Sequence, residues 1–117
     1  MTTTGVQTIL YPVRDLAKAK ELFTRLAGAE PVADSPYYVG YQIGDQQIGL
    51  VPGGHDSQNM TGTTAFWHVD DIKAAVQTVL DAGGATQQEA HDVGGGRLVA
   101  AVTDAEGNVI GFIQDAA

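Results

Sequence analysis

Three histidines are the side chains of this sequence that could do acid–base or metal chemistry near neutral pH: His55, His68 and His91. There is no cysteine, which excludes a thiol nucleophile, a thiolate metal site and a disulfide framework. His68 lies in an apolar stretch typical of a strand, where an imidazole facing a cavity could act as acid, base or hydrogen-bond donor. The alternative is a strand-end histidine bonded to backbone or water, since no Asp or Ser partner is evident in the sequence. His68 is therefore the candidate catalytic residue.

Two further patterns invite a chemical interpretation. His55-Asp56, His68 and His91-Asp92 together could hold a metal, but their spacing matches no known ligand pattern, so we expect solvated loop residues instead. The run Gly94-Gly95-Gly96-Arg97 could bind phosphate, but a phosphate loop should lead into a helix N-terminus. This run leads into a predicted strand at 98–103. We therefore expect a turn, with Arg97 at the rim of a site.

The elements that must position these residues occur twice along the chain. Val13-Arg14-Asp15-Leu16 matches Val69-Asp70-Asp71-Ile72 at an offset of 56 residues, and Gln47–Val51 matches Val109–Ile113 at an offset of 62. The difference indicates a six-residue insertion in the second copy, around Gly94-Gly95-Gly96. A repeat of this kind fixes the architecture before any single motif does.

Each copy predicts a strand, a helix and three more strands. The first strands, 6–13 and 63–69, are rich in β-branched and aromatic residues. Asp15 and Asp71 are candidate N-caps, and Gly28 and Gly83 are candidate helix ends. The later strands are expected at 32–33, 37–43 and 47–51, and at 86–89, 98–103 and 109–114. The chain is thus a single α+β domain over residues 1–117, with module one at 5–52, a linker at 53–62 and module two at 63–115.

This order of elements, with Val-Arg-Asp-Leu opening the first helix and Asp-Ala-Glu-Gly-Asn-Val-Ile-Gly-Phe-Ile-Gln closing the chain, resembles the vicinal oxygen chelate superfamily. That group includes glyoxalase I, extradiol dioxygenases, and fosfomycin- and bleomycin-resistance proteins. The resemblance implies two tandem βαβββ modules forming a curved mixed sheet, or cup, with helices on its outer face. It also implies a homodimer.

The metal enzymes of that superfamily place one ligand on the first strand of each module and a carboxylate on the last. Thr8, Gly49, Thr64 and Gly111 stand at those positions here. A Thr hydroxyl is a feeble ligand and Gly has no side chain, so the usual metal site cannot form. We expect no metal and no other cofactor.

Strand alternation assigns the remaining side chains to two faces. Ile9, Tyr11, Val13, Ala65, Trp67 and Val69 are expected to face the helices as core. Of the tyrosines on 37–43, Tyr38 lies opposite Tyr37 and Tyr41, and either set could stack on a planar ligand. We expect a mostly apolar cup, widened at the two glycines, with the following ligand-binding residues: Thr8, Leu10, Tyr38, Gly49, Val51, Thr64, Phe66, His68, Gly111 and Ile113.

The net charge of −8 disfavours nucleic acid and anionic membranes as partners. No apolar run is long enough to cross a bilayer, and the N-terminus lacks signal-peptide features, so a cytoplasmic location is expected. The leading hypothesis is metal-independent binding of a small, mainly apolar or aromatic molecule, with the acidic charge favouring a cationic one. The alternative is a lyase, isomerase or dioxygenase that uses His68 or an atypical metal site. The sequence leaves open whether the protein is an enzyme.

Overall fold

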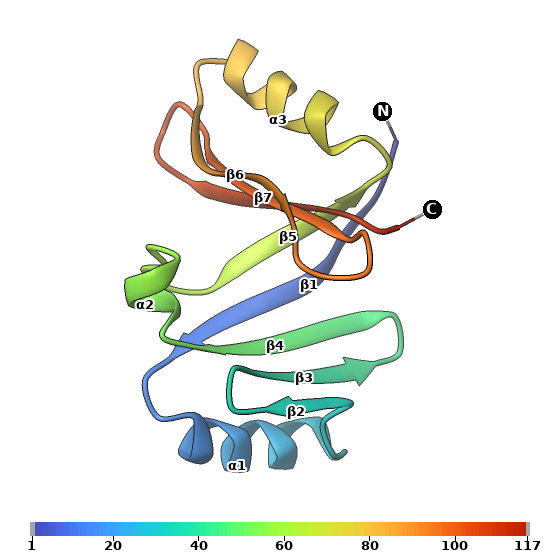
Figure 1. Cartoon of the computed structure of the whole chain (residues 1–117), viewed down its shortest axis with the longest axis vertical. Coiled ribbons are helices and arrows are strands. Elements are labelled where there is room, and N and C mark those ends of the chain that lie inside the picture. Colours follow the sequence, from blue (N-terminus) through green and yellow to red (C-terminus); the bar gives the residue numbers. More distant parts are fainter. Residues whose placement is uncertain (1, 117) are drawn as a thin grey trace. The chain divides into compact units, whose positions relative to one another are not determined.

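The computed structural model describes residues 2–116, which form two compact units. One unit is Thr8–Thr64, and the other combines residues 2–7 with residues 65–116. Strand β1 (Thr3–Val13) contributes to both units. The βαβββ order of elements and the α+β class are as predicted from the sequence (Figure 1). None of the helices within residues 2–116 is long and apolar enough to cross a membrane.

In the unit Thr8–Thr64, β1 is followed by one helix, three strands and a short helix. These are α1 (Leu16–Ala27), β2 (Ala33–Ser35), β3 (Tyr38–Ile43), β4 (Gln46–Pro52) and α2 (Gly54–Ser57). The strands are hydrogen-bonded in the order β2-β3-β4-β1. The β1–β4 pair is parallel, with Leu10 opposite Gly49, and the other pairs are antiparallel.

Helix α1 covers one face of this sheet (Figure 1). The Asp15 carboxylate accepts a hydrogen bond from the Lys18 amide at 3.1 Å and so caps the first turn. Gly28 ends the helix in a left-handed conformation, with φ of 66°. The buried core beneath α1 consists of Val39, Tyr41 and Leu50, with partly buried side chains packed against it: Tyr11, Val13, Leu16, Ala19, Phe23, Ala27 and Ile48.

The unit of residues 2–7 and 65–116 repeats this plan. Its elements after β1 are β5 (Thr64–Val69), α3 (Ile72–Asp81), β6 (Ala85–Asp92), β7 (Leu98–Thr103) and β8 (Val109–Gln114). The hydrogen-bonding order is β1-β5-β8-β7-β6, and the β5–β8 pair is parallel. Asp71 caps α3 through the Ala74 amide, as predicted. The core residues are Val69, Ile72, Ala75, Ala100, Val102 and Phe112.

The structure differs from the sequence-based expectations at three places. The predicted linker contains the short helix α2. Strand β6 reaches Asp92, well beyond the expected 86–89, and its pairing with β7 has two register shifts. Trp67 was expected in the core but is 42% exposed. Helix α3 packs mainly over β6, β7 and β8, so it leaves Trp67 on β5 uncovered.

Candidate functional site

The first pair of superfamily ligand positions, Thr8 and Gly49, lies on the sheet face opposite α1. Thr8 is 3% exposed, and its hydroxyl donates to the side-chain oxygen of Gln47 at 3.3 Å. A β-carbon added at Gly49 would overlap the Tyr38 hydroxyl and the Leu10 side chain. The space at Gly49 is therefore occupied by neighbouring side chains.

The second pair, Thr64 and Gly111, likewise consists of a buried threonine and a glycine covered by a neighbouring side chain. Thr64 is 6% exposed. Gly111 lies opposite Phe66 in the β5–β8 register, and an added β-carbon would overlap the Phe66 ring. The expectation that the two glycines widen a cavity is wrong at both positions. Without a side chain, each glycine lets an aromatic ring pack directly on the backbone, and that ring fills the gap.

The remaining predicted ligand-binding residues lie beside these glycines. Val51 follows Gly49 by two residues on β4 and is buried, and Ile113 stands in the same relation to Gly111 on β8. Ile113 is also the register partner of His68. The structure thus brings together Leu10, Tyr38 and Gly49 in one unit, and it groups Phe66, His68, Gly111 and Ile113 in the other.

The residues present do not fit the metal of the superfamily. Threonine and glycine stand at all four ligand positions, and the glycine spaces are filled by Tyr38, Leu10 and Phe66. Within residues 2–116, no three His, Asp or Glu side chains converge as a metal-binding group. His91, which was expected in a loop, lies on strand β6, and its Nδ1 is 2.9 Å from the backbone oxygen of Glu89.

His68 has a carboxylate partner that sequence reasoning missed. The His68 side chain is 8% exposed, and its Nδ1 lies 3.4 Å from Oδ2 of Asp115. The other oxygen of Asp115, Oδ1, lies 3.0 Å from Nε of Arg97. A usable signal was present: Asp115 follows β8 directly, and the carboxyl ends of the parallel strands β5 and β8 lie at one edge of the sheet.

A cavity of about 550 Å³ opens at this edge of the sheet. It is lined mainly by polar side chains: Thr2, Thr3, Thr4, Gln7, His68, Val69, Asp70, Gln114 and Asp115. The Thr2 hydroxyl donates to Asp70 at 2.6 Å and the Thr2 amide at 2.8 Å, and these hydrogen bonds lower the pKa of the Asp70 carboxyl. The cavity around the candidate catalytic residue therefore carries two carboxylates, which the mostly apolar cup expected from the sequence did not include.

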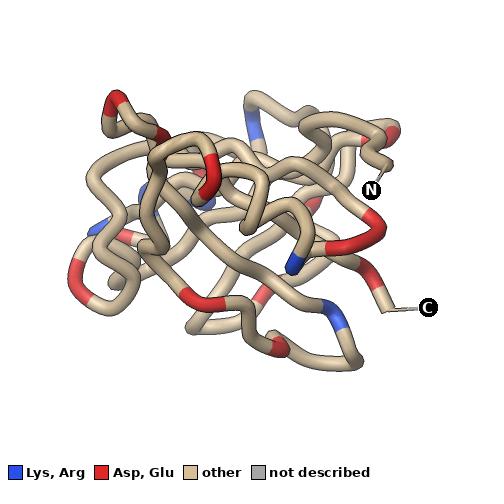
Figure 2. Tube along the Cα trace, turned by 90° about the horizontal axis from the view of Figure 1, so that it is seen from above, with Lys and Arg blue, Asp and Glu red and all other residues tan. Residues whose placement is uncertain are grey.

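The chain as a whole is acidic. Acidic residues outnumber basic ones by 14 to 6. Asp and Glu occur along the whole length of the chain rather than in one segment (Figure 2). A positively charged group would approach this surface more readily than an anion.

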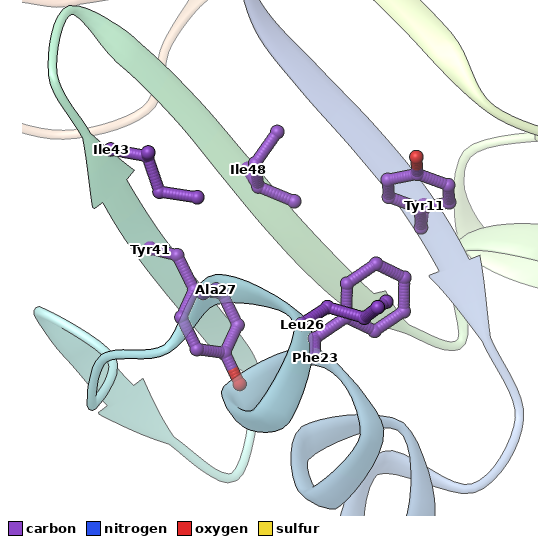
Figure 3. A pocket seen from close by; sticks show the side chains of 7 residues that line it. All are labelled: Tyr11, Phe23, Leu26, Ala27, Tyr41, Ile43 and Ile48. Atoms are coloured by element: carbon purple, nitrogen blue, oxygen red, sulfur yellow. The ribbon is translucent and has the colours of Figure 1, made fainter.

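An apolar cavity of about 170 Å³ lies elsewhere, between α1 and its sheet (Figure 3). It is lined by Tyr11, Phe23, Leu26, Ala27, Tyr41, Ile43 and Ile48, none of which was predicted as a ligand-binding residue. The Tyr41 hydroxyl is 2.8 Å from the Thr24 hydroxyl and donates to the Lys20 carbonyl at 3.1 Å. Tyr41 therefore packs against α1, and of the tyrosines on this strand it is Tyr38 that lies over the glycine face.

The sequence profile of the Glyoxalase/Bleomycin resistance protein/Dioxygenase superfamily matches residues 5–112. The chain belongs to this superfamily, in agreement with the resemblance found from its sequence. No curated protein is similar enough in sequence to count as a match.

Solved structures with the same fold share little sequence with this chain. Methylmalonyl-CoA epimerase from Mycobacterium tuberculosis is 19% identical, with a TM-score of 0.76, over 98% of this chain and 90% of that one. A superfamily member from Vibrio splendidus is 19% identical, with a TM-score of 0.68, over 97% and 100% of the two chains. A protein named as an NAD-dependent benzaldehyde dehydrogenase from Legionella pneumophila is 15% identical, with a TM-score of 0.72, over 93% and 98%. At these identities the likeness shows the fold alone.

Proposed function

We propose that this protein binds a small molecule without the metal used by other members of its superfamily. The carrying observation is that both glycine positions are filled by packing: Tyr38 and Leu10 lie over Gly49, and Phe66 lies over Gly111. A metal would need donor side chains at Gly49 and Gly111, whereas the space at both positions is filled by packed side chains.

The ligand we propose is mainly apolar or aromatic and carries a cationic group. The carboxylates of Asp70 and Asp115 line the cavity beside His68 and favour a positive charge there. The apolar part would lie against Val69, the apolar side chain in the lining of the same cavity. A molecule with an aromatic ring and a cationic group would suit both features.

Calorimetric titration with 2-phenylethylamine, 2-phenylethanol and phenylacetate tests this proposal. These probes share a ring and differ in charge, so we expect the amine to bind most tightly and the acid least. Asp115→Asn should weaken amine binding by about threefold to tenfold, because a charged hydrogen-bond partner is lost. Asp45→Asn removes an equal charge from an exposed turn and should leave binding unchanged. Equal binding of all three probes, or no saturable binding of any aromatic amine, would refute the proposal.

A second candidate function is proton transfer by His68, as a lyase or an isomerase would need. The Asp115 carboxylate, whose Oδ2 lies 3.4 Å from His68 Nδ1, favours it, since a carboxylate beside an imidazole can orient the ring for acid–base work. Among the structural neighbours is an epimerase, methylmalonyl-CoA epimerase, which makes carbon-bound hydrogen exchange a suitable reaction to test.

Exchange of the α-hydrogen of acyl thioesters in D2O, followed by proton NMR, would detect this activity. We expect His68→Gln to abolish any exchange and His91→Gln, at an exposed position of strand β6, to leave it intact. Exchange that persists in His68→Gln would exclude His68 as the acid or base.

We propose further that the protein works as a cytoplasmic homodimer. Trp67 and Val6, on the neighbouring strands β5 and β1, are 42% and 43% exposed, and adjacent exposed apolar side chains suit a protein interface. Sedimentation equilibrium would measure the mass in solution. A monomer at micromolar concentration would contradict this part of the proposal.

A further inference from the structure

Three charged or polar side chains from distant parts of the chain meet at the edge of the β5–β8 sheet. His68 comes from β5, Asp115 follows β8, and Arg97 follows the turn between β6 and β7. Asp115 lies between the other two, with one carboxylate oxygen at 3.0 Å from Arg97 Nε and the other at 3.4 Å from His68 Nδ1. The His68 side chain is 8% exposed, that of Arg97 32% and that of Asp115 61%.

The glycine turn before Arg97 brings this residue close to Asp115. Gly94, Gly95 and Gly96 all have positive φ, a conformation that other residues rarely adopt. The Arg97 amide donates to the Gly94 carbonyl at 3.2 Å, and the Val93 amide donates to the Arg97 carbonyl at 2.9 Å, which closes the turn. A β-carbon on Gly96 would come within 3.2 Å of Ala116, so the glycine also permits close approach of the segment that carries Asp115.

The first copy of the repeat provides an internal comparison. At the repeat offsets, Pro12 takes the place of His68 and Gly53 that of Asp115. The glycine turn lies in the six-residue insertion of the second copy. The histidine, its carboxylate and the turn that brings the arginine thus occur together in one copy only.

We infer that Arg97 and Asp115 are positioning residues that hold the neutral His68 ring with its proton on Nδ1. The Asp115 carboxylate, 3.4 Å from Nδ1, electrostatically favours the ring form that carries its proton on that nitrogen, and the Arg97 guanidinium, 3.0 Å from the same carboxylate, attracts it from the other side. The ring then presents the lone pair of Nε2 as an acceptor, which is the form that a general base or a ligand-binding acceptor requires. The catalytic use of this tautomer rests on the second candidate function. The tautomer itself can be measured whether or not the protein has any activity.

The experiment is nitrogen-15 NMR of the His68 imidazole in the full-length protein, above the pH at which the ring is protonated. The nitrogen shifts report which ring nitrogen carries the proton. We expect the Nδ1–H form to be the major form in the wild type. Asp115→Asn should shift the tautomer ratio toward Nε2–H by about threefold or more, because the charged acceptor is lost. Arg97→Gln should give a smaller shift in the same direction.

Matched variants separate this effect from a general change of charge or fold. Asp45→Asn and Arg14→Gln remove the same charges at exposed positions and should leave the His68 tautomer ratio unchanged. A backbone amide spectrum checks that each variant is folded. An Nε2–H form that predominates in the wild type, or a ratio unaffected by Asp115→Asn, would overturn the inference. If the tautomer ratios are as expected but the protein transfers no proton, only the second candidate function is overturned.

Discussion

Gly49 and Gly111 stand at equivalent positions in the two copies, and each is covered by an aromatic side chain. The contact over Gly49 also involves Leu10, whereas the three atoms nearest an added β-carbon at Gly111 all belong to the Phe66 ring. In both cases the aromatic residue lies on a neighbouring strand and in register with or close to the glycine. Glycine at these two positions therefore provides no metal-binding side chain and also lets an aromatic ring pack closely on the backbone.

Replacing Gly111 with alanine tests this packing. The added β-carbon would overlap the Phe66 ring, so we expect the free energy of unfolding to fall by about 1–3 kcal/mol in chemical denaturation. Gly62→Ala is the matched control, because no atom lies within 4 Å of its added β-carbon. Equal stability of Gly111→Ala and wild type would show that the ring moves aside without cost.

Asp104 gives a pH-dependent prediction at the same scale. Hydrogen bonds from the Asn108 side chain, and then from the Asn108 and Glu106 amides, lower the pKa of the Asp104 carboxyl. A lowered folded pKa stabilises the protein above the unfolded pKa of about 3.9, and that contribution is lost as pH falls through the folded value.

Urea denaturation between pH 7 and pH 3 would measure this contribution. We expect Asp104→Asn to lose less stability than wild type on acidification, because its side chain does not titrate. The effect should be modest, since Asp104 is near the surface. Asp45→Asn should follow the wild-type curve, and a parallel loss in Asp104→Asn would contradict the assignment.

At the scale of elements, the two long helices pack to different depths. Helix α3 buries Ile72 and Ala75, whereas no residue of α1 is fully buried. Leu22 and Leu26 of α1 are 54% and 71% exposed. The apolar cavity of about 170 Å³ lies beneath the second half of α1, between the helix and its sheet (Figure 3). The first copy thus has the looser helix–sheet contact.

Ala27→Leu should fill part of this cavity. Ala27 is the last residue of α1 and lines the cavity, so a larger apolar side chain there gains burial without displacing the sheet. We expect an increase in the free energy of unfolding of about 1 kcal/mol. Ala17→Leu places the same side chain at an exposed position of the helix and should have little effect. A destabilised Ala27→Leu protein would mean that the space cannot accept the added volume.

At the scale of the whole chain, the two modules share a fold but differ in their charged and titratable side chains. Both lack the superfamily's metal donors, but only the second has the histidine, the carboxylate and the arginine turn. The first has the apolar cavity beneath its helix. The two copies thus share a fold but differ in the residues that could carry a function, and the shared fold does not decide that function.

Metal independence predicts how the whole protein responds to chelation. Protein purified without a histidine tag should contain no stoichiometric divalent ion by elemental analysis. Its thermal midpoint should be unchanged by EDTA or by an excess of Zn²⁺, Mg²⁺ or Mn²⁺, because a ligand that binds the folded state would raise it. A rise in the midpoint that saturates at one ion per chain would contradict the proposed function.

The sequence by itself determined the repeat and the order of elements, and its resemblance to the superfamily was confirmed. The repeat and the order of elements follow from local signals: apolar periodicity, the capping residues Asp15 and Asp71, and turn glycines such as Gly28. The sequence also predicts that Thr8, Gly49, Thr64 and Gly111 do not supply the usual metal ligands, because threonine is a weak donor and glycine has no side chain.

Only the tertiary structure decided what fills the glycine positions, why Trp67 is exposed, and which carboxylate meets His68. Tyr38 reaches Gly49 across paired strands, and Asp115 reaches His68 because β5 and β8 are parallel neighbours. Strand register and the length of the side chains determine these contacts, and neither can be predicted from the periodicity of the sequence. The candidate catalytic histidine was found from residue type and strand position, but its partners required the folded chain.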